Sequence, residues 1–425
     1  MFAGKRILML QGPVGPFFRR FAQDLEALDA KVFKVNFNGG DWLFFPSGAI
    51  AYKGGLAEWP EFLRNVLETW QIDIVILYGD CRPVHETVFK LQDTFRLDVY
   101  TFEEGYIRPD YITLEKGRAN GYSSLPRNPI AYLNGPDIAA PDCTRIGYSF
   151  RHLALWGGLY HMAAALLRPV FPCHTYHRGI GLRELRPQLR SYWRKALYAW
   201  RDRGRLAQFK AALSGRYFLV PLQVNLDSQI KRHSDFSSDG MEGFILHVLE
   251  SFARNAPEDV RLVFKHHPMD RGYHDYSRFI RKQARRLDLQ GRVIYVHDLH
   301  LPTLINHARG VIVVNSTVGL SAILHGKPVK TCGKALYDMA GLTAPVGLDA
   351  FWRQAEDFIP DKNLVRRYNA TVIRRTQING NFYKRLPNTP LRCGLNLNRR
   401  RTAAPGTGVS ESATAFPDDN QAGTG

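Results

Sequence analysis

Strand and helix patterns alternate along most of the chain, and this alternation constrains the fold more than any other feature of the sequence. Short apolar runs predict strands, for example at residues 6–10 (RILML), 31–37 (KVFKVNF) and 72–80 (IDIVILYGD). Between these runs, apolar residues recur at the spacing of an amphipathic helix. Strands that alternate with helices of about 10–15 residues predict βαβ units, and therefore parallel sheets.

The alternation occurs twice, which predicts two α/β domains. It breaks at residues 125–141, which are rich in Pro and Asn, and a mainly helical, basic stretch follows to about residue 214. From residue 216 the pattern resumes, with strands predicted in RYFLVPLQ, VRLVFKHHP, RVIYVHD, GVIVVN and KPVKTCG. Two Rossmann-like domains joined by a helical region favour the GT-B architecture of glycosyltransferases, with substrates in a cleft beyond the carboxyl ends of the strands.

The predicted organisation therefore has five parts. Residues 1–150 form an N-terminal Rossmann-like domain on the acceptor side, and residues 151–215 form a basic helical connector that could touch a membrane. Residues 216–345 form the C-terminal Rossmann-like domain, which would bind the nucleotide, and residues 346–390 form helices that pack back on the first half. Residues 391–425 lack apolar periodicity and are predicted to be disordered.

The charge of the chain favours a polyanionic partner. A net charge of +18 suits nucleic acid, an anionic membrane surface or phosphorylated substrates. Residues 178–210 alone contain ten Lys or Arg against two acids, and Tyr192, Trp193, Tyr198 and Trp200 lie among them. Two interpretations of this stretch stay open: a solvated helical face, and a surface that lies on anionic lipid headgroups.

The most apolar segment is too short to cross a membrane. Residues 153–167 are interrupted by Tyr160 and His161 and fall short of the ~20 residues that a spanning helix needs, so they predict a buried or interfacial helix. No signal-peptide pattern precedes the first predicted strand. The five cysteines are scattered without metal-binding spacing, which favours a reducing compartment and no structural zinc.

Basic side chains follow a strand of the second half. Lys265, His266, His267 and Pro268 come directly after the apolar run 260–264. An imidazolium can neutralise a phosphate and give it a proton as it leaves, because its pKa lies near neutral pH. A His-Pro pair is also common without a function, and this alternative stays open. These residues are candidates for phosphate binding.

Residues 310–329 (GVIVVNSTVGLSAILHGKPV) predict a strand, a turn and a helix with a glycine C-cap. Asn315, Ser316 and Thr317 stand at the helix start, and Gly319 in the first turn would permit close approach. Exposed N–H groups with two hydroxyls suit a phosphate. Ordinary N-capping explains one of these residues but not the cluster, so we expect anion binding here.

Polar residues also end strands of the first half. The loop QGPVGP matches neither a dinucleotide fingerprint nor a P-loop, but its glycines let a ligand approach the backbone, so Gln11 and Gly12 are candidates. Glu103 and Glu104 end a predicted strand, and Arg108 follows closely.

A further glutamine and carboxylate, Gln223 and Asp227, follow the first strand of the second half. A carboxylate on each side of a cleft is what glycosyl transfer with retention needs if it proceeds by double displacement. One carboxylate is the nucleophile, and another carboxylate or the departing phosphate handles the proton. An N-cap or an ion pair is the alternative for each of these side chains.

Seven segments together resemble the capsule polysaccharide biosynthesis and export proteins of the KpsS/LipB type. They lie in the same order over residues 5–345, and they are LQGPVGPFFRRFAQDL, KVNFNGGDWLF, LYGDCRPVH, FEEGYIRPDYITLE, PLQVNLDSQI, KHHPMDRG and VNSTVGLSAILHGKPVK. The resemblance implies a cytoplasmic enzyme, peripheral on the inner face of a Gram-negative inner membrane. Such an enzyme transfers the acidic keto-sugar Kdo, β-linked, from CMP-β-Kdo to phosphatidylglycerol or its lyso form.

This transfer starts the oligo-Kdo linker on which capsular polysaccharide is attached for export, so the resemblance also implies a KpsC-type transferase and the export machinery as partners. It implies Asp227 as the catalytic aspartate, four residues after Gln223, with His267-Pro268 and Ser316-Thr317 on the CMP phosphate. Glu104-Gly105 matches the family's acidic-Gly motif, and residues 296–302 would line the nucleotide.

No cofactor and no metal are expected, because a monophosphate leaving group can be neutralised by imidazoles and a helix N-terminus, and no DxD-type motif is placed to hold a metal beside a diphosphate. Three alternatives stay open. The chain could use another nucleotide sugar, act as a non-catalytic export or lipid-binding component, or bind nucleic acid, which fits the charge but not the acidic strand ends.

Overall fold

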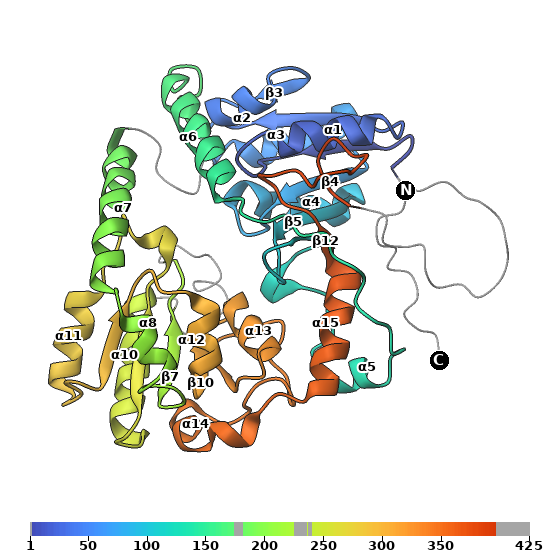
Figure 1. Cartoon of the computed structure of the whole chain (residues 1–425). Helices are drawn as coiled ribbons and strands as arrows, with labels where there is room; N and C mark the ends of the chain where they lie inside the picture. The colour runs from blue at the N-terminus through green and yellow to red at the C-terminus, as the bar shows by residue number, and fades with distance from the viewer. Residues whose placement is uncertain (1, 174–181, 225–235, 237–239, 397–425) are drawn as a thin grey trace. The chain divides into compact units, whose positions relative to one another are not determined.

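A computed structural model describes residues 2–173, 182–224, 236 and 240–396 (Figure 1). They form two compact α/β units. Unit 1 draws on Met1–Ala119, Ala140–Leu182 and Val372–Gly425, and unit 2 on Asn120–Ala139 and Arg183–Thr371. Each unit contains a largely parallel sheet, so the predicted α/β class with two Rossmann-like sheets is confirmed.

The sheet of unit 1 has seven strands in the order β12-β6-β5-β4-β1-β2-β3. The strands from β5 to β3 are parallel, whereas β6 and β12 are antiparallel to their neighbours. Their bounds are β1 Arg6–Met9, β2 Lys31–Asn36, β3 Ala49–Ala51, β4 Ile74–Tyr78, β5 Asp98–Glu104, β6 Tyr111–Lys116 and β12 Gln377–Asn379. The strand order reverses between β1 and β4, and ligands of open α/β sheets gather at such a reversal.

Helices cover both faces of this sheet. They are α1 (Phe17–Glu26), α2 (Gly39–Phe44), α3 (Trp59–Trp70), α4 (Pro83–Phe95) and α6 (Phe150–Leu166). The sequence of strand β1 is continuously apolar because both faces of the strand are buried. Ile7 and Met9 point into one core cluster with Phe17 of α1, whereas Leu8 packs into a second cluster with Leu63 of α3 on the other face.

The sheet of unit 2 has five parallel strands in the order β11-β10-β7-β8-β9. Their bounds are β7 Tyr217–Pro221, β8 Arg261–Lys265, β9 Val293–Val296, β10 Gly310–Val313 and β11 Val329–Thr331. The order reverses between β7 and β10, as it does between β1 and β4. The described part of the chain therefore contains the same succession of parallel strands twice.

The described helices of unit 2 are α5 (Pro129–Leu133), α7 (Leu182–Arg201), α8 (Arg205–Lys210), α10 (Gly240–Asn255), α11 (Ser277–Arg286), α12 (Leu301–His307), α13 (Thr317–Leu324) and α14 (Leu348–Gln354). Helix α15 (Lys362–Thr376) begins in unit 2 and ends in unit 1, which it enters at Val372. Short 3-10 turns lie at Asn120–Tyr122 (η1), Pro268–Asp270 (η2) and Ala355–Phe358 (η3). A buried cluster that includes Phe252 and Trp352 joins α10 and α14 to the strands.

The predicted helical connector, residues 151–215, is divided between the units. Helix α6 packs on α2 in unit 1, whereas α7 and α8 belong to unit 2. The α2–α6 contact needs Gly39 and Gly40, because a Cβ at these positions would lie 2.4 Å from the carbonyl oxygen of Ala163 and 2.6 Å from the ring of Tyr160. The Tyr160 hydroxyl donates to Asp41 Oδ1 at 2.9 Å.

The prediction that the helices of residues 346–390 pack on the first half is wrong, because α14 packs on α10 and most of α15 also belongs to unit 2. The element that joins the sheet of unit 1 is a strand. After α15, β12 pairs antiparallel with β6. The side chain of Gln377 accepts from the N–H of Tyr106 at 2.8 Å and donates to Thr113 Oγ1 at 3.0 Å. These buried bonds fix the register of a strand that is only three residues long.

The prediction of disorder from residue 391 is wrong for residues 391–396. Cys393 and Leu395 are buried in the core of unit 1. The backbone N–H groups of Arg392 and Cys393 each donate at 2.8 Å to the carboxylate of Asp24. The buried carboxylate of Asp24 thus holds residues 391–396, an irregular segment whose sequence lacks the apolar periodicity of a helix or strand. Residues 397–425 lie outside the described residues.

Candidate functional site

In unit 2, two predicted residues bond directly across the reversal of strand order. Gln223 follows β7 and Asn315 follows β10. Gln223 Nε2 donates to Asn315 Oδ1 at 3.1 Å, and Gln223 Oε1 accepts from the Asn315 N–H at 3.4 Å. This pair fixes the spacing of the two loops in which a ligand of a Rossmann-like sheet would lie.

The turn after Asn315 starts helix α13. Ser316 is its N-cap, and Ser316 Oγ accepts from the Val318 N–H at 3.2 Å. A Cβ at Gly319 would lie 2.2 Å from the Tyr337 hydroxyl, and that hydroxyl donates to the carbonyl oxygen of Ser316. The close approach predicted at Gly319 is therefore made by Tyr337. Thr317, half-buried, opens the helix, whose N-terminus carries partial positive charge.

Lys265 ends β8 and is buried. Its Nζ donates to the carbonyl oxygens of His297 at 3.3 Å and His266 at 3.4 Å. Burial lowers the pKa of Lys265 to about 8, and the charge of Asp298 opposes this effect. The side chain is thus a cation at neutral pH. Its ammonium group is held at the strand end by hydrogen bonds to these two carbonyl oxygens.

The two adjacent histidines differ in environment. His266 is buried, and its Nδ1 lies 2.6 Å from the Tyr295 hydroxyl. Burial, reinforced by the neighbouring His297, lowers the pKa of His266 to about 3. The expected imidazolium is therefore wrong for His266, which is neutral at physiological pH.

His267 is half-buried and caps a short turn. Its Nδ1 accepts from the Met269 N–H at 3.2 Å, and Pro268 is exposed at the first position of η2. Because Nδ1 accepts, the proton of a neutral His267 ring is on Nε2. His267 can thus donate a hydrogen bond to a phosphate without being charged.

Helix α7 supports this strand end. Tyr198 stacks on His297 with ring centroids 3.6 Å apart, and Asp202 accepts from the backbone N–H groups of His297 and Asp298 at 2.9 and 3.3 Å. Burial lowers the pKa of His297 to about 4. Arg271 pairs with Asp298. Of the predicted segment 296–302, His297 and Asp298 are therefore held by Tyr198 of α7 and by Asp202, a connection that the sequence did not reveal.

Unit 1 has a comparable bond across its own reversal. Gln11, buried after β1, accepts through Oε1 from Arg82 Nη1 at 2.7 Å, and Arg82 follows β4. A Cβ at Gly12 would lie 2.7 Å from the ring of Phe18, so packing accounts for this glycine. A cavity of about 20 Å³ borders Gly12 and Lys34, which is room for about one water molecule.

The predicted carboxylates end β5 and differ in their partners. Glu104 Oε1 accepts from the hydroxyls of Tyr383 at 2.8 Å and Tyr78 at 3.2 Å. Glu103 accepts from the Glu104 N–H at 3.0 Å. Burial raises the pKa of Glu103 to about 7; the charges of Glu104 and Asp80 act in the same direction, and the Glu104 N–H opposes them. Glu103 therefore gains and loses a proton near neutral pH.

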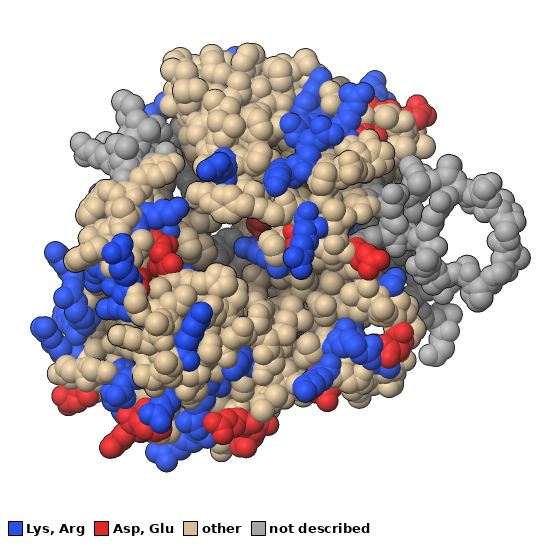
Figure 2. Space-filling view, in the orientation of Figure 1, with Lys and Arg blue, Asp and Glu red and all other residues tan. Residues whose placement is uncertain are grey.

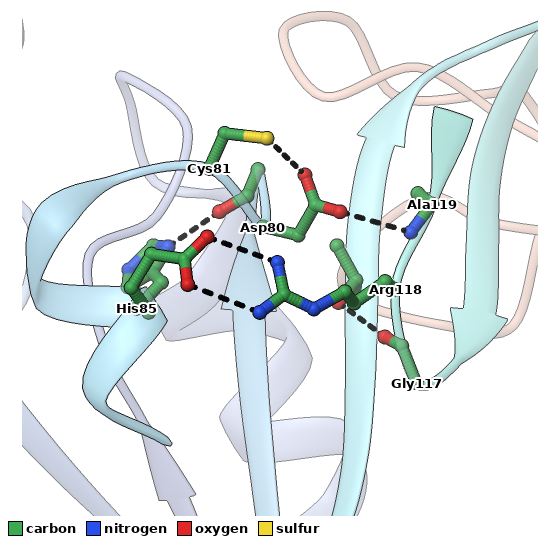
Figure 3. Close-up of polar contacts among 9 residues, drawn as sticks. Asp80, Cys81, His85, Gly117, Arg118 and Ala119 are labelled. Carbon is green, nitrogen blue, oxygen red and sulfur yellow. Dashed lines mark hydrogen bonds and ion pairs between the residues drawn. The ribbon is translucent and has the colours of Figure 1, made fainter. Parts of the chain in front are cut away.

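The loop after β4 is fixed by a polar network (Figure 3). His85 Nδ1 lies 2.5 Å from the Gly79 carbonyl oxygen, and Asp80 accepts from the Ala119 N–H at 3.3 Å and from Cys81 Sγ at 3.1 Å. Glu86 and Arg118 form a two-bond ion pair at 2.9 and 3.0 Å. This network places Arg82 beside Gln11.

Two predicted residues stand apart from these groups. Arg108 is exposed in the loop after β5, where its Nε donates to the Gly105 carbonyl oxygen at 3.0 Å. Asp227 lies outside the described residues. Conversely, the prediction missed Arg82, Tyr78 and Tyr383. Arg82 stands in the LYGDCRPVH segment, which was part of the resemblance but received no role.

Comparison with known proteins identifies the family. Residues 73–383 match the profile of a family described as capsule polysaccharide biosynthesis protein. The chain is also 39% identical over 393 residues to the capsule polysaccharide export protein KpsS of Escherichia coli, which covers 90% of this chain and 98% of that protein. The chain belongs to the capsule polysaccharide biosynthesis protein family.

Other members and a solved structure are similar to this family member. The capsule polysaccharide modification protein LipB of Neisseria meningitidis serogroup A is 38% identical over 393 residues, covering 90% of this chain and 93% of LipB. A structure of KpsC, a β-Kdo 2,4 transferase of Thermosulfurimonas dismutans, aligns with 16% identity and a TM-score of 0.40, over 90% of this chain and 94% of that one. The predicted resemblance to the KpsS/LipB type is confirmed.

In this capsule polysaccharide biosynthesis protein, the motifs of the resemblance cluster at strand ends. LYGDCRPVH follows β4, FEEGYIRPDYITLE spans the β5–β6 connection, KHHPMDRG follows β8 and VNSTVGL follows β10. Within the described part of the chain, no three His, Cys, Asp or Glu side chains gather as a metal site. Over the same residues, no helix has both the length and the apolar composition to traverse a bilayer.

Proposed function

We propose that this protein is a retaining glycosyltransferase that moves β-Kdo from CMP-β-Kdo to phosphatidylglycerol or its lyso form. Membership of the capsule polysaccharide biosynthesis family supports a role in the capsule pathway. The observation that carries the proposal is the group at the strand ends of unit 2, where Lys265 and His267 lie at the end of β8 and α13 follows β10, the two strands on either side of β7. This group suits a nucleoside monophosphate.

The donor phosphate binds to Lys265 and the N-terminus of α13. The ester carries one negative charge, which one ammonium and a helix N-terminus neutralise without a metal ion. His267 donates a hydrogen bond from Nε2 as the charge on the departing CMP rises. The Gln223–Asn315 pair keeps the loops after β7 and β10 at a fixed distance.

The sugar is transferred in two displacements. The carboxylate of Asp227, four residues beyond Gln223, attacks the anomeric carbon, the bond to the phosphate oxygen breaks, and CMP leaves with the electron pair. The acceptor hydroxyl then attacks the same carbon and releases the aspartate. Retention follows because each displacement inverts the configuration.

Glu103 takes the proton of the acceptor hydroxyl. Its pKa of about 7 suits a base that operates at neutral pH. Glu104, held by two tyrosine hydroxyls, fixes the end of β5 on which Glu103 stands. The net charge of +18 suits both the acidic sugar and the anionic lipid. We propose that the protein works on the inner face of the inner membrane, together with a KpsC-type transferase and the export machinery.

Mass spectrometry of the lipid product tests the proposal. The full chain is incubated with a CMP-Kdo-generating system and a fluorescent phosphatidylglycerol. We expect lipid heavier by one or more Kdo units, and no product with Asp227→Ala. Unchanged lipid, with protection against thermal unfolding by UDP but not by CMP, would instead favour another nucleotide sugar. Unchanged lipid without any nucleotide binding would favour a non-catalytic export component.

A further inference from the structure

Helices α2 and α6 leave an apolar surface of unit 1 exposed. We propose that this surface, the α2–α6 face, docks on an anionic lipid bilayer. It consists of five side chains, which are Trp42, Leu43, Leu155, Met162 and Leu166. The inference deepens the proposed function, on which it rests for the identity of the lipid acceptor, by assigning the part of the molecule that meets the membrane.

One side of α6 is committed to unit 1. Tyr160, Ala163 and Ala164 are buried, and the first two lie against Gly39 and Gly40 of α2. The Tyr160 hydroxyl also accepts from Asn38 Nδ2 at 2.8 Å. These contacts fix the rotation of α6 about its axis, and so they decide which of its residues point outward.

The outward side of α6 is apolar. Leu155, Met162 and Leu166 are 54%, 54% and 72% exposed. They are separated by seven and four residues, so they lie along one line on the helix. Helix α2 adds Trp42 at 44% and Leu43 at 40% exposure. Apart from one arginine and two histidines, the sequence of α6 is apolar, aromatic or glycine, and exposed apolar side chains gathered on one helix mark an interaction site.

The charges around this face suit anionic headgroups. Residues 143–183 contain no Asp or Glu. Arg145, Arg151 and Arg168 are exposed before, within and just after α6. The space-filling view shows no acidic residue over α6 (Figure 2). An apolar surface flanked by arginines, with a tryptophan among its residues, has the composition of an interfacial membrane contact.

Helix α6 is suited to lie on a bilayer rather than to cross it. It has 17 residues, and within the described part of the chain no helix qualifies as a membrane span. Each exposed leucine or methionine that enters the apolar layer is removed from water, which favours binding, and the flanking arginines add electrostatic attraction. The face therefore binds reversibly, as a peripheral enzyme requires.

Helix α7, the stretch first expected to touch a membrane, is partly committed elsewhere. Tyr198 is buried against His297, and Arg194 donates to the carbonyl oxygen of Arg271 at 2.8 Å. Tyr192, Trp193 and Trp200 remain exposed. Trp193 and Trp200 are seven positions apart and therefore also share one line, so α7 serves as the competing surface in the test.

Vesicle flotation with the full chain tests the inference. Vesicles of phosphatidylcholine alone are compared with vesicles that also contain phosphatidylglycerol, without any sugar donor. We expect binding to the second kind, weakened at least about tenfold by Met162→Asp with Leu166→Asp. Ile130→Asp with Ile359→Asp, two residues 58% and 62% exposed in unit 2, is the matched control and should bind normally.

Three outcomes would overturn the inference: no vesicle binding by the unaltered chain, normal binding by the α6 variant, or loss of binding only in Trp193→Asp with Trp200→Asp. Self-association that the α6 variant abolishes, without vesicle binding, would also overturn it and assign the face to a second copy. Thermal unfolding is the control for folding. Each variant should unfold at a temperature close to that of the unaltered chain, because all the altered side chains are exposed.

A second measurement separates this inference from the proposed function. Transfer to a short-chain phosphatidylglycerol, dissolved below the concentration at which it forms micelles, needs no bilayer. We expect the α6 variant to keep this transfer while it loses vesicle binding. If the unaltered chain binds vesicles through α6 but transfers nothing, the proposed function fails and the docking surface stands.

Discussion

Each unit places a glutamine two residues after the first strand of its sheet, and each glutamine bonds across the reversal of strand order. Gln11 accepts from the guanidinium of Arg82. Gln223 exchanges two bonds with the neutral amide of Asn315. The scaffold is the same, but the surroundings are opposite: carboxylates and tyrosines in unit 1, a lysine and imidazoles in unit 2.

Burial acts on both groups, and the comparison shows what it does to each kind of charge. In unit 1 it raises the pKa of Glu103 to about 7, so an acid is kept partly protonated. In unit 2 it lowers the pKa of His266 to about 3, so a base is kept neutral. The first group is suited to moving a proton, whereas the second, with Lys265 and backbone dipoles, is suited to holding an anion.

The largest expected effect is on the proton-transfer side. Glu103→Gln should lower the rate of transfer about 10²–10⁴-fold, because an amide cannot accept the proton. In the unaltered enzyme the rate should rise with pH through about 7, since only the carboxylate is a base, and the variant should lose this rise. A pH–rate profile measures it. Glu104→Gln is the control: its oxygen can still accept from Tyr78 and Tyr383, so the rise should persist, shifted to lower pH because the charge of Glu104 no longer raises the pKa of Glu103. An unchanged profile in Glu103→Gln would contradict the assignment.

The next effect concerns the anion-holding side. Lys265→Met should weaken CMP binding about 10–100-fold, because a buried charge-assisted contact is lost. Isothermal titration calorimetry measures the affinity. Arg82→Met removes the corresponding cation of unit 1 and should leave CMP affinity unchanged. Equal losses of CMP affinity in both variants would show that CMP binding is not specific to the group in unit 2.

The stability cost of alanine at two glycines, Gly105 and Gly319, compares how rigid the two groups are. A Cβ at Gly105 would lie 2.0 Å from the backbone oxygen of Tyr111, and one at Gly319 would lie 2.2 Å from the hydroxyl of Tyr337. Alanine at either position should cost about 1–3 kcal/mol of stability, and more at Gly105 because a backbone moves less easily than a ring. Urea unfolding measures both. Gly157→Ala, which meets nothing within 4 Å, should cost nothing.

The smallest effect is the pH dependence of stability, which should have opposite signs in the two groups. His297 has a lowered pKa, so its contribution to stability is present above about 6.5 and is lost as the pH falls towards about 4. Glu103 has a raised pKa, so its contribution is present below about 4.5 and is lost as the pH rises through about 7.

His297→Phe keeps the ring that stacks on Tyr198 and removes the titration. Among the described residues neither nitrogen of His297 has a hydrogen-bond partner, so the substitution should be mild. Between pH 7.5 and 4.5 the unfolding midpoint should fall by about 2–4 °C less in this variant than in the unaltered chain. Parallel curves would mean that His297 does not titrate as inferred.

The architecture could be predicted from the sequence because both sheets are buried on both faces, which makes their strands short apolar runs between helices. Strand β12 could not, because Gln377–Asn379 carries no strand pattern and is held by the side-chain bonds of Gln377 to Tyr106 and Thr113. The packing of residues 391–396 was missed for a similar reason, since it depends on the distant carboxylate of Asp24.

For the candidate site, position was predictable and protonation was not. Strand ends located Gln223, Lys265 and Asn315, which the structure brings to neighbouring strands. The neutrality of His266 depends on burial among side chains from other elements, such as Tyr295, that no local pattern announces. Likewise, position 319 needs a glycine because the Tyr337 hydroxyl lies against it, a contact that no local pattern announces.

The discontinuity of unit 1 has a consequence for its synthesis. A ribosome completes residues 120–371, which contain all of unit 2, before it adds β12 and the buried Cys393 and Leu395. Until then the edge of β6 that later binds β12 has no strand beside it, and an open edge is a place where nascent chains join wrongly. A message truncated shortly after α15 would therefore yield a finished unit 2 attached to an unfinished neighbour.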